Sequence, residues 1–268
     1  MIIVGEKING TRKLVAKAIA ERDASFIQDL ARRQVDGGVN WLDTNAGVNP
    51  DKEPETLIWL VQTIQAVTDV PVCLDSANPA ALVAAIEYVK RMPMINSISG
   101  EQKRLQGILP LVSRHKCSVI ALATDDNGIP KNTADRLTII RRLIGETRQA
   151  DIPDGNVYVD PLAMALATNT QSGSIALDTI RAVHMEFPDV HIISGLSNVS
   201  FGLPARTLVN QAFLTLAMEA GMDSAILDPL DKGLRSALMA AEVVLGRDRF
   251  CLNYSRAYRA GKLFEHKR

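Results

Sequence analysis

The sequence is poor in cysteine. Its 268 residues include only three, Cys73, Cys117 and Cys251, which lie far apart and form no C-x-x-C pair. An odd number of scattered cysteines indicates neither a disulfide framework nor a zinc knuckle, and it suits a reducing environment. We therefore expect a cytoplasmic protein that folds around a hydrophobic core, with Cys73 as one small buried residue of that core.

Excess charge and long apolar runs are also missing. The 30 Lys and Arg residues balance the 30 Asp and Glu residues, so the formal net charge at pH 7 is zero. A chain without basic excess is not expected to bind nucleic acid or an anionic membrane surface. No apolar run approaches the roughly 18 residues of a membrane helix, and residues 1–6 contain no basic leader. We expect neither a nucleic-acid nor a membrane partner.

Histidine is scarce, and its positions do not suit catalysis. Of the four histidines, we expect three on helices or in the C-terminal tail and one, His191, at the start of a strand. The sequence contains no H-E-x-x-H motif, no cysteine cluster, and no Ser-His-Asp or Cys-His arrangement. We therefore expect no metal ion of the protein's own.

A regular alternation of short apolar runs and helical patterns organises the whole chain. Eight runs of strand length end in polar residues, and they begin near residues 2, 40, 70, 94, 118, 157, 191 and 225. Continuous apolar runs between amphipathic helices are typical of a parallel sheet that is covered on its outer face. Eight such units predict an α/β protein with a single (β/α)8 TIM barrel, as one domain over residues 1–268.

An open, doubly wound sheet is the alternative architecture. Such a sheet normally has a G-x-G-x-x-G turn after its first strand, and this sequence has none. The basic end of the chain, residues 256–268, is expected to be a solvated tail.

Polar residues gather at the predicted carboxyl ends of the strands, where barrel enzymes have their active sites. We expect Lys7 and Arg206 to be almost the only cations there. A mouth rich in carboxylates and carboxamides suits either magnesium or a neutral heterocycle with several N–H donors. For each Asp, the alternative is a cap or turn residue. The predicted ring comprises Glu6, Asn9, Asp43, Asn45, Asp75, Asn96, Asp125, Asp160, Asn198 and Asp228.

The end of the seventh predicted strand combines several polar groups with a glycine. Gly195 has no Cβ, so its backbone can approach a flat ligand closely. Ser197, Asn198 and Ser200 place hydrogen-bonding groups beside it. The alternative is a polar turn with an Asn cap.

Six segments in order along the chain together resemble the pterin-binding barrel family. They are residues 5–10, 42–45, 73–76, 94–97, 160–161 and 195–200. Within that family the chain looks most like the methyltetrahydrofolate:corrinoid protein methyltransferases. The folate domain of cobalamin-dependent methionine synthase is a more distant match.

The resemblance implies methyl transfer between N5 of tetrahydrofolate and the cobalt of a corrinoid protein, in either direction. Tetrahydrofolate and 5-methyltetrahydrofolate would be substrates, the corrinoid would come from a partner protein, and the enzyme would be a homodimer. Its place would be an O-demethylase system or a related anaerobic one-carbon pathway. Two alternatives stay open, namely a dihydropteroate synthase-like enzyme and a non-catalytic folate-binding or corrinoid-docking subunit.

The resemblance also implies roles for individual residues. The pterin edge would be bound by Asp75, Asn96 and Asp160. Asn198 would lie beside N5 and would be the catalytic residue. Further residues implied in the folate site are Gly195 and Ser197 in its wall, Arg206 near its outer part, and Glu6, Asp43 and Phe201 as additional candidates. Phe201 replaces a Gln of the acetogenic enzyme, which favours a stacking contact over a polar one.

Overall fold

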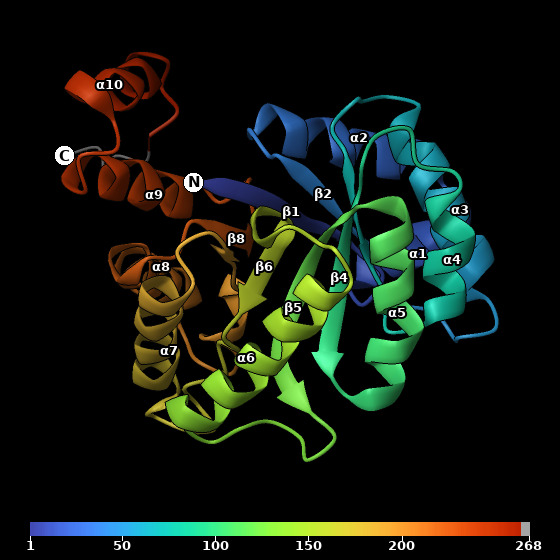
Figure 1. The fold of residues 1–268 in the computed structure, drawn as a ribbon. Coiled ribbons are helices and arrows are strands. Elements are labelled where there is room, and N and C mark those ends of the chain that lie inside the picture. Colours follow the sequence, from blue (N-terminus) through green and yellow to red (C-terminus); the bar gives the residue numbers. More distant parts are fainter. Residues whose placement is uncertain (264–268) are drawn as a thin grey trace.

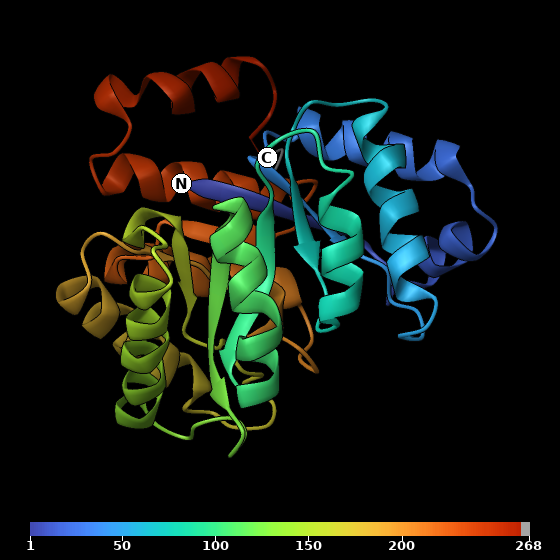
Figure 2. The ribbon, with the colours of Figure 1, turned by 45° about the vertical axis from the view of Figure 1, so that its right-hand side comes forward.

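Eight parallel strands form a barrel that is surrounded by helices in a computed structural model (Figures 1 and 2). The structure describes residues 1–263. The hydrogen-bonded order of the strands is β7-β6-β5-β4-β3-β2-β1-β8. The strands are β1 (Ile2–Asn9), β2 (Trp41–Asn45), β3 (Val72–Asp75), β4 (Met94–Gly100), β5 (Ser118–Asp125), β6 (Val157–Asp160), β7 (His191–Ile192) and β8 (Ser224–Leu227).

The barrel closes between β7 and β8, where the pairing is short. An isolated parallel bridge joins Gly195 to Ile226, and the Ile226 amide donates to the Ser194 carbonyl at 2.9 Å. These contacts confirm the predicted (β/α)8 barrel. Strand β1 extends to Asn9, beyond the run of residues 2–4 that its apolar residues predict, because Ile8 also faces the hydrophobic core.

Helices follow every strand, and their first turns agree with the capping residues in the sequence. The Asp23 side chain accepts the Phe26 amide, and the Asn78 side chain accepts the Ala80 amide. The helices are α1 (Lys13–Ala20), α2 (Ala24–Asp36), α3 (Glu53–Gln65), α4 (Pro79–Ile86), α5 (Gln102–His115), α6 (Thr133–Gln149), α7 (Ser172–Glu186), α8 (Arg206–Ala220), α9 (Lys232–Val244) and α10 (Leu252–Arg259), with short 3₁₀ turns η1 (Asp154–Asn156), η2 (Leu196–Asn198) and η3 (Arg249–Cys251).

Two hydrophobic clusters hold the barrel together. The larger one lies between the strands and the helices. The smaller one fills the interior of the barrel with side chains from six strands or their ends: Val4, Cys73, Met94, Ile120, Tyr158 and Ile193. The prediction that Cys73 is a core residue is confirmed, and burial raises the pKa of its thiol well above its usual value.

The amino-terminal end of the barrel is closed by aromatic residues. The rings of Tyr158 and His191 stack at 4.5 Å, and Trp41 meets Tyr158 edge-on at 6.0 Å. The His191 Nδ1 atom lies 2.6 Å from a carboxylate oxygen of Asp223, which also accepts the Ile192 amide at 3.0 Å. The barrel is therefore sealed at this end, and access is left to the mouth.

The first part of the predicted solvated tail, residues 256–259, is exposed apart from Ala257, but it is helical. Residues 256–259 belong to helix α10, and residues 264–268 lie outside the described residues. The Asp248 carboxylate accepts the amides of Asn253 and Tyr254 at 3.1 and 2.9 Å, which caps this helix, and Ala257 is buried. The prediction rested on the basic residues of this segment and did not take Asp248 into account as a helix cap.

Asp223→Ala should lower the free energy of unfolding at pH 7 by about 1–2 kcal/mol, since this half-exposed carboxylate holds an amide and an imidazole. Burial opposes its charge, but the contacts with His191, Ser224 and the Ile192 amide outweigh burial and lower the Asp223 pKa. This stabilisation is therefore present above the unfolded carboxyl pKa of about 4 and fades as the pH falls below it.

Denaturant unfolding at pH 7 and pH 3 would measure the effect, with the exposed Asp51→Ala as the matched control. Equal stability of the two variants at pH 7 would contradict the assigned role of Asp223.

Candidate active site

The mouth of the barrel begins with three polar residues in register on β2, β3 and β4. Asn45 pairs with Asp75, and Asp75 pairs with Asn96. The Asn45 amide donates to an Asp75 carboxylate oxygen at 3.0 Å. The Asn45 Oδ1 atom is buried and has no hydrogen-bond partner among residues 1–263. The Asn45 Oδ1 atom is therefore an acceptor beside Asp75 that a ligand donor could use.

Asp75 is an acceptor that is held partly away from water. Burial is the main cause that raises its pKa to about 6, while the hydrogen bond from Asn45 and the positive charge of Arg104 act in the opposite direction. Arg104 reaches the mouth from α5. Its Nε and Nη2 atoms donate to the carbonyl and the hydroxyl of Ser97 at 2.9 and 3.0 Å. Arg104 thus fixes the segment that follows Asn96 and supplies charge near Asp75.

Asp43 lies deeper and is almost fully buried, with 3% of its surface exposed. Burial, followed by the charge of Asp75, raises its pKa well above the usual value. The Asn96 amide approaches its carboxyl oxygen at 3.4 Å. Asp43 is therefore placed to orient Asn96 from below.

Asp160 stands at the end of β6, with strand β5 between it and Asn96. The strands of Asp75 and Asn96 are immediate neighbours, whereas β6 is separated from β4 by β5. Burial is the main cause that raises the Asp160 pKa to about 6, and the Leu162 and Gly195 amides partly offset it. Behind it, the buried Arg136 donates to the carbonyls of Pro161 and Leu162 at 2.6 and 2.9 Å.

The segment after β7 folds into the turn η2 and is fixed from both sides. The Ser197 hydroxyl donates to the Glu6 carboxylate at 2.5 Å, and Arg12 donates to the other Glu6 oxygen at 2.7 Å. Arg206 donates to the Ser200 hydroxyl at 3.0 Å and to the Ser197 carbonyl at 2.6 Å. Its guanidinium also lies 5.9 Å from the ring of Phe201, which is 68% exposed.

Asn198 is exposed, and its carboxamide has no hydrogen-bond partner among the described residues. A Cβ added to Gly195 would lie 3.0 Å from the Asn198 amide nitrogen. The absence of a Cβ at Gly195 therefore leaves room for the side chain of Asn198. A free donor and acceptor at the rim of the mouth suits contact with a ligand.

Three polar residues of the predicted ring are instead engaged near the rim. Asn9 accepts the Thr11 amide, and Asp125 accepts the Asn127 amide. Asp228 accepts Lys7 at 2.7 Å and the Leu230 amide at 2.9 Å. For Asn9 and Asp125, the turn interpretation is supported.

The expectation that Lys7 and Arg206 are almost the only cations is wrong. Arg12, Arg104 and Arg136 also reach the mouth or the residues that support it. A signal for two of them was present in the sequence. Arg104 lies four residues before Ile108, and Arg136 lies four residues before Ile140, so each falls on the apolar face of its helix. An arginine on such a face needs polar partners inside the fold.

The resulting mouth offers several acceptors, with no group of three or more metal-ligating side chains among residues 1–263. A cavity of about 180 Å3 adjoins it and is lined by Glu6, Arg12, Ser197, Arg206 and Asn210, among others. Such a mouth suits a flat molecule that donates several N–H bonds.

The comparisons with known proteins identify the family to which this barrel belongs. The sequence profile described as "Pterin binding enzyme" matches residues 5–228, and the chain therefore belongs to that family. Among its relatives is the methylcorrinoid:tetrahydrofolate methyltransferase of Eubacterium limosum, which is 38% identical over 265 residues and 98% of either chain. The methionine synthase of Mycobacterium tuberculosis is 29% identical over 84% of this chain, but over only 20% of its own length.

Solved dihydropteroate synthases share the architecture. The Yersinia pestis enzyme in complex with a pterine-sulfa conjugate superposes with a TM-score of 0.69, covering 92% of this chain and 93% of that one, at 15% identity. At this identity the likeness shows the fold alone.

The structure also contains no helix long and apolar enough to cross a membrane among its described residues.

Arg104→Gln should raise the pKa of Asp75 above its value of about 6, because the positive charge of Arg104 now lowers it. Carbon-13 NMR titration of the aspartate carboxyls would measure this, with Asp160 as an internal reference. Arg104→Lys, which retains the charge, should leave Asp75 closer to the wild-type value. An unchanged Asp75 titration in Arg104→Gln would show that the arginine only supports the backbone.

Proposed function

We propose that this protein transfers a methyl group between N5 of tetrahydrofolate and the cobalt of a corrinoid protein. The observation that carries the proposal is the 38% identity, over 98% of both chains, to a methylcorrinoid:tetrahydrofolate methyltransferase. The acceptor-rich mouth of the barrel supports it. Tetrahydrofolate and 5-methyltetrahydrofolate are the substrates in this proposal, and a partner protein brings the corrinoid.

The pterin edge fits the acceptors of the mouth. An amino-pyrimidinone presents adjacent N–H donors, and a carboxylate accepts two parallel N–H bonds. We assign this contact to Asp75 and Asp160, with Asn96 donating and accepting beside them. The unpartnered Oδ1 of Asn45 adds an acceptor that the resemblance did not include. Asp43 is assigned an indirect role, since it is buried beneath Asn96.

Asn198 is the residue that we assign to N5. A methyl group leaves a tertiary amine poorly unless the nitrogen is hydrogen-bonded or protonated as its charge changes. The free carboxamide of Asn198 can donate to the N5 lone pair or accept from its proton. Its exposure lets it act at the rim, where a corrinoid must approach. Gly195 and Ser197 form the adjoining wall, and Arg206 and Phe201 flank the outer part of the folate.

The same proposal extends to the metal requirement, oligomeric state, location and pathway of the enzyme. It needs no metal of its own, because the cobalt arrives as part of the partner. We further propose a cytoplasmic homodimer of a single domain that serves an O-demethylase system or a related one-carbon pathway.

A dihydropteroate synthase is the weaker candidate. It would have to bind a pyrophosphate, but residues 195–198 carry no cation and Arg206 is already engaged by Ser197 and Ser200. Mixing the protein with 5-methyltetrahydrofolate and a cobalt(I) corrinoid, and following the corrinoid spectrum, separates the candidates. A methyltransferase forms methylcobalt(III), whereas a synthase or a non-catalytic binding subunit leaves the spectrum unchanged.

Asp75→Ala and Asp160→Ala should each weaken folate binding by about 1.5–3 kcal/mol, since each leaves ligand N–H donors without a charged partner. Because both carboxyls have a pKa of about 6, wild-type affinity should fall as the pH drops through that value. The fall should approach about tenfold per pH unit for each carboxylate involved.

Calorimetry across pH 5–8 would test this, with Asp125→Ala as the matched control because that carboxylate holds only a local turn. Affinities that are unchanged in both variants, with the fold intact, would remove the assignment of the pterin edge.

Asn198→Ala should reduce the rate of methyl transfer by roughly 10², while folate affinity changes much less. An interaction that strengthens as charge shifts on N5 acts on the transition state more than on the bound substrate. Single-turnover rates at saturating folate would measure this. If Asn198 is only a turn residue, Asn198→Gly should be nearly harmless, and near wild-type rates in both variants would end its catalytic assignment.

A further inference from the structure

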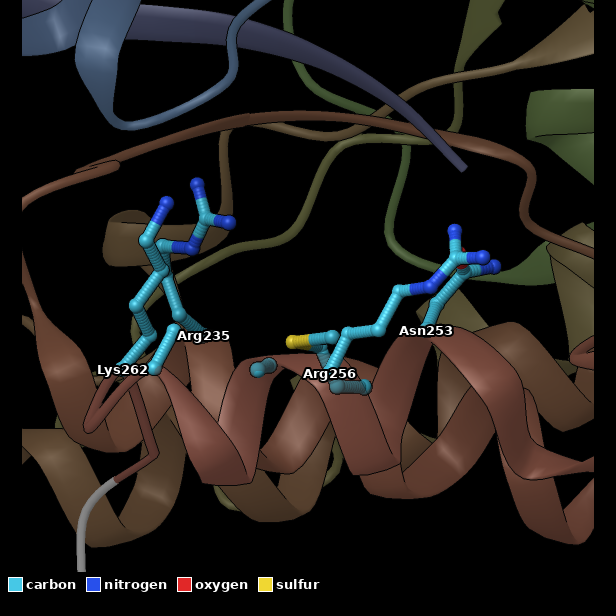
Figure 3. Close-up of a pocket in the computed structure, with 7 residues that line it drawn as sticks. Arg235, Asn253, Arg256 and Lys262 are labelled. Carbon is cyan, nitrogen blue, oxygen red and sulfur yellow. The ribbon is translucent and has the colours of Figure 1, made fainter.

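A second cavity lies outside the barrel, along helices α9 and α10, and has a volume of about 320 Å3 (Figure 3). Its lining comes from residues 235–262, beyond the segment 5–228 that matches the pterin-binding family. Arg235, Arg256 and Lys262 contribute to its wall together with Asn253, and Met239 and Ala257 contribute apolar surface. Figure 3 shows Arg235 and Lys262 together at one end of the cavity, while the Arg256 side chain extends toward Asn253 at the other end.

The three cations of this cavity are unpaired. Among residues 1–263, no carboxylate forms an ion pair with Arg235, Arg256 or Lys262, and their side chains form no hydrogen bond. Arg235 is also partly buried, and its Nη1 atom is shielded from water without a partner. A Cβ on Gly38 would lie 3.3 Å from this atom, so the turn before β2 covers the guanidinium.

Three unpaired cations around one hollow repel one another, and a shielded N–H group without an acceptor is unfavourable. Some surface arginines elsewhere in this chain have carboxylate partners, as Arg141 has Glu186 and Arg148 has Asp154. A bound anion would supply the missing acceptors and offset the repulsion. A doubly charged anion would neutralise more of this positive charge, and would offer more acceptors, than a single carboxylate does.

We propose that this cavity binds a small phosphate-bearing molecule. Arginine recognises phosphate through parallel N–H bonds, and lysine contributes a point charge. Lys262 would hold the phosphate beside Arg235, whose covered Nη1 would gain an acceptor, and Arg256 would add positive charge from the other end of the cavity. Met239 and Ala257 would contact the carbon part of a phosphate ester. The inference does not depend on the methyl-transfer proposal, because it concerns residues outside the barrel mouth.

Phosphorus-31 NMR titration of the full-length protein at constant ionic strength would test the site, with inorganic phosphate and phenyl phosphate as probes. Both should show saturable broadening, and phenyl phosphate should bind more tightly if the apolar wall is used. The double variant R256A/K262A should weaken binding at least about tenfold. The matched variant R249A/R259A removes two cations of η3 and α10 that do not line the cavity. It should change affinity less than about twofold.

Three results would overturn the proposal: no saturable broadening by either probe, equal loss in the two double variants, or displacement by saturating 5-methyltetrahydrofolate. Equal loss would indicate only the diffuse positive charge of residues 249–262, and displacement would place the probe in the barrel mouth.

Discussion

The burial of hydrogen-bond acceptors at the barrel mouth is the constraint around which the site is arranged. Asp75 and Asp160 are drawn away from water far enough for burial to raise each pKa to about 6. The hydrogen bond from Asn45 to Asp75 and the Leu162 and Gly195 amides at Asp160 limit that shift, and the charges of Arg104 and Arg136 act in the same direction. A ligand rich in N–H donors would replace the water that these carboxylates lose on burial. The cost of their dehydration in the unliganded site therefore favours such a ligand.

The two ends of the barrel differ in the side chains that line them. At the amino-terminal end, Trp41, Tyr158 and His191 pack together, and Asp223 fixes the imidazole. At the carboxyl end, the strands stop in short polar side chains that cannot fill the opening. Asp43 and Cys73 are buried between these two ends, while Asn198 at the rim is exposed.

Much of the site could be predicted from the order of residues along the chain. Parallel strands bring their carboxyl ends to one edge, so the sequence alone was enough to place Asp75, Asn96 and Asp160 at the mouth. Helical residues were harder to predict. Arg104 and Arg136 come from α5 and α6, and spacing shows only that each lies on a buried face, not which strand end it meets. The capped helix α10 was missed for a similar reason, because the basic residues around it suggested solvent.

Strand and helix alternation, helix caps and the barrel fold followed from local patterns, because hydrophobic periodicity and capping depend on neighbouring residues. Which polar residues became acceptors for a ligand was decided by the tertiary structure. Asn9 and Asp125 share the strand-end position of Asp75, yet each is satisfied by an amide two residues away. Asp160 also accepts an amide two residues away, that of Leu162. Asp75 and Asp160 differ by their burial, the main cause of their raised pKa, which exists only once the barrel has closed.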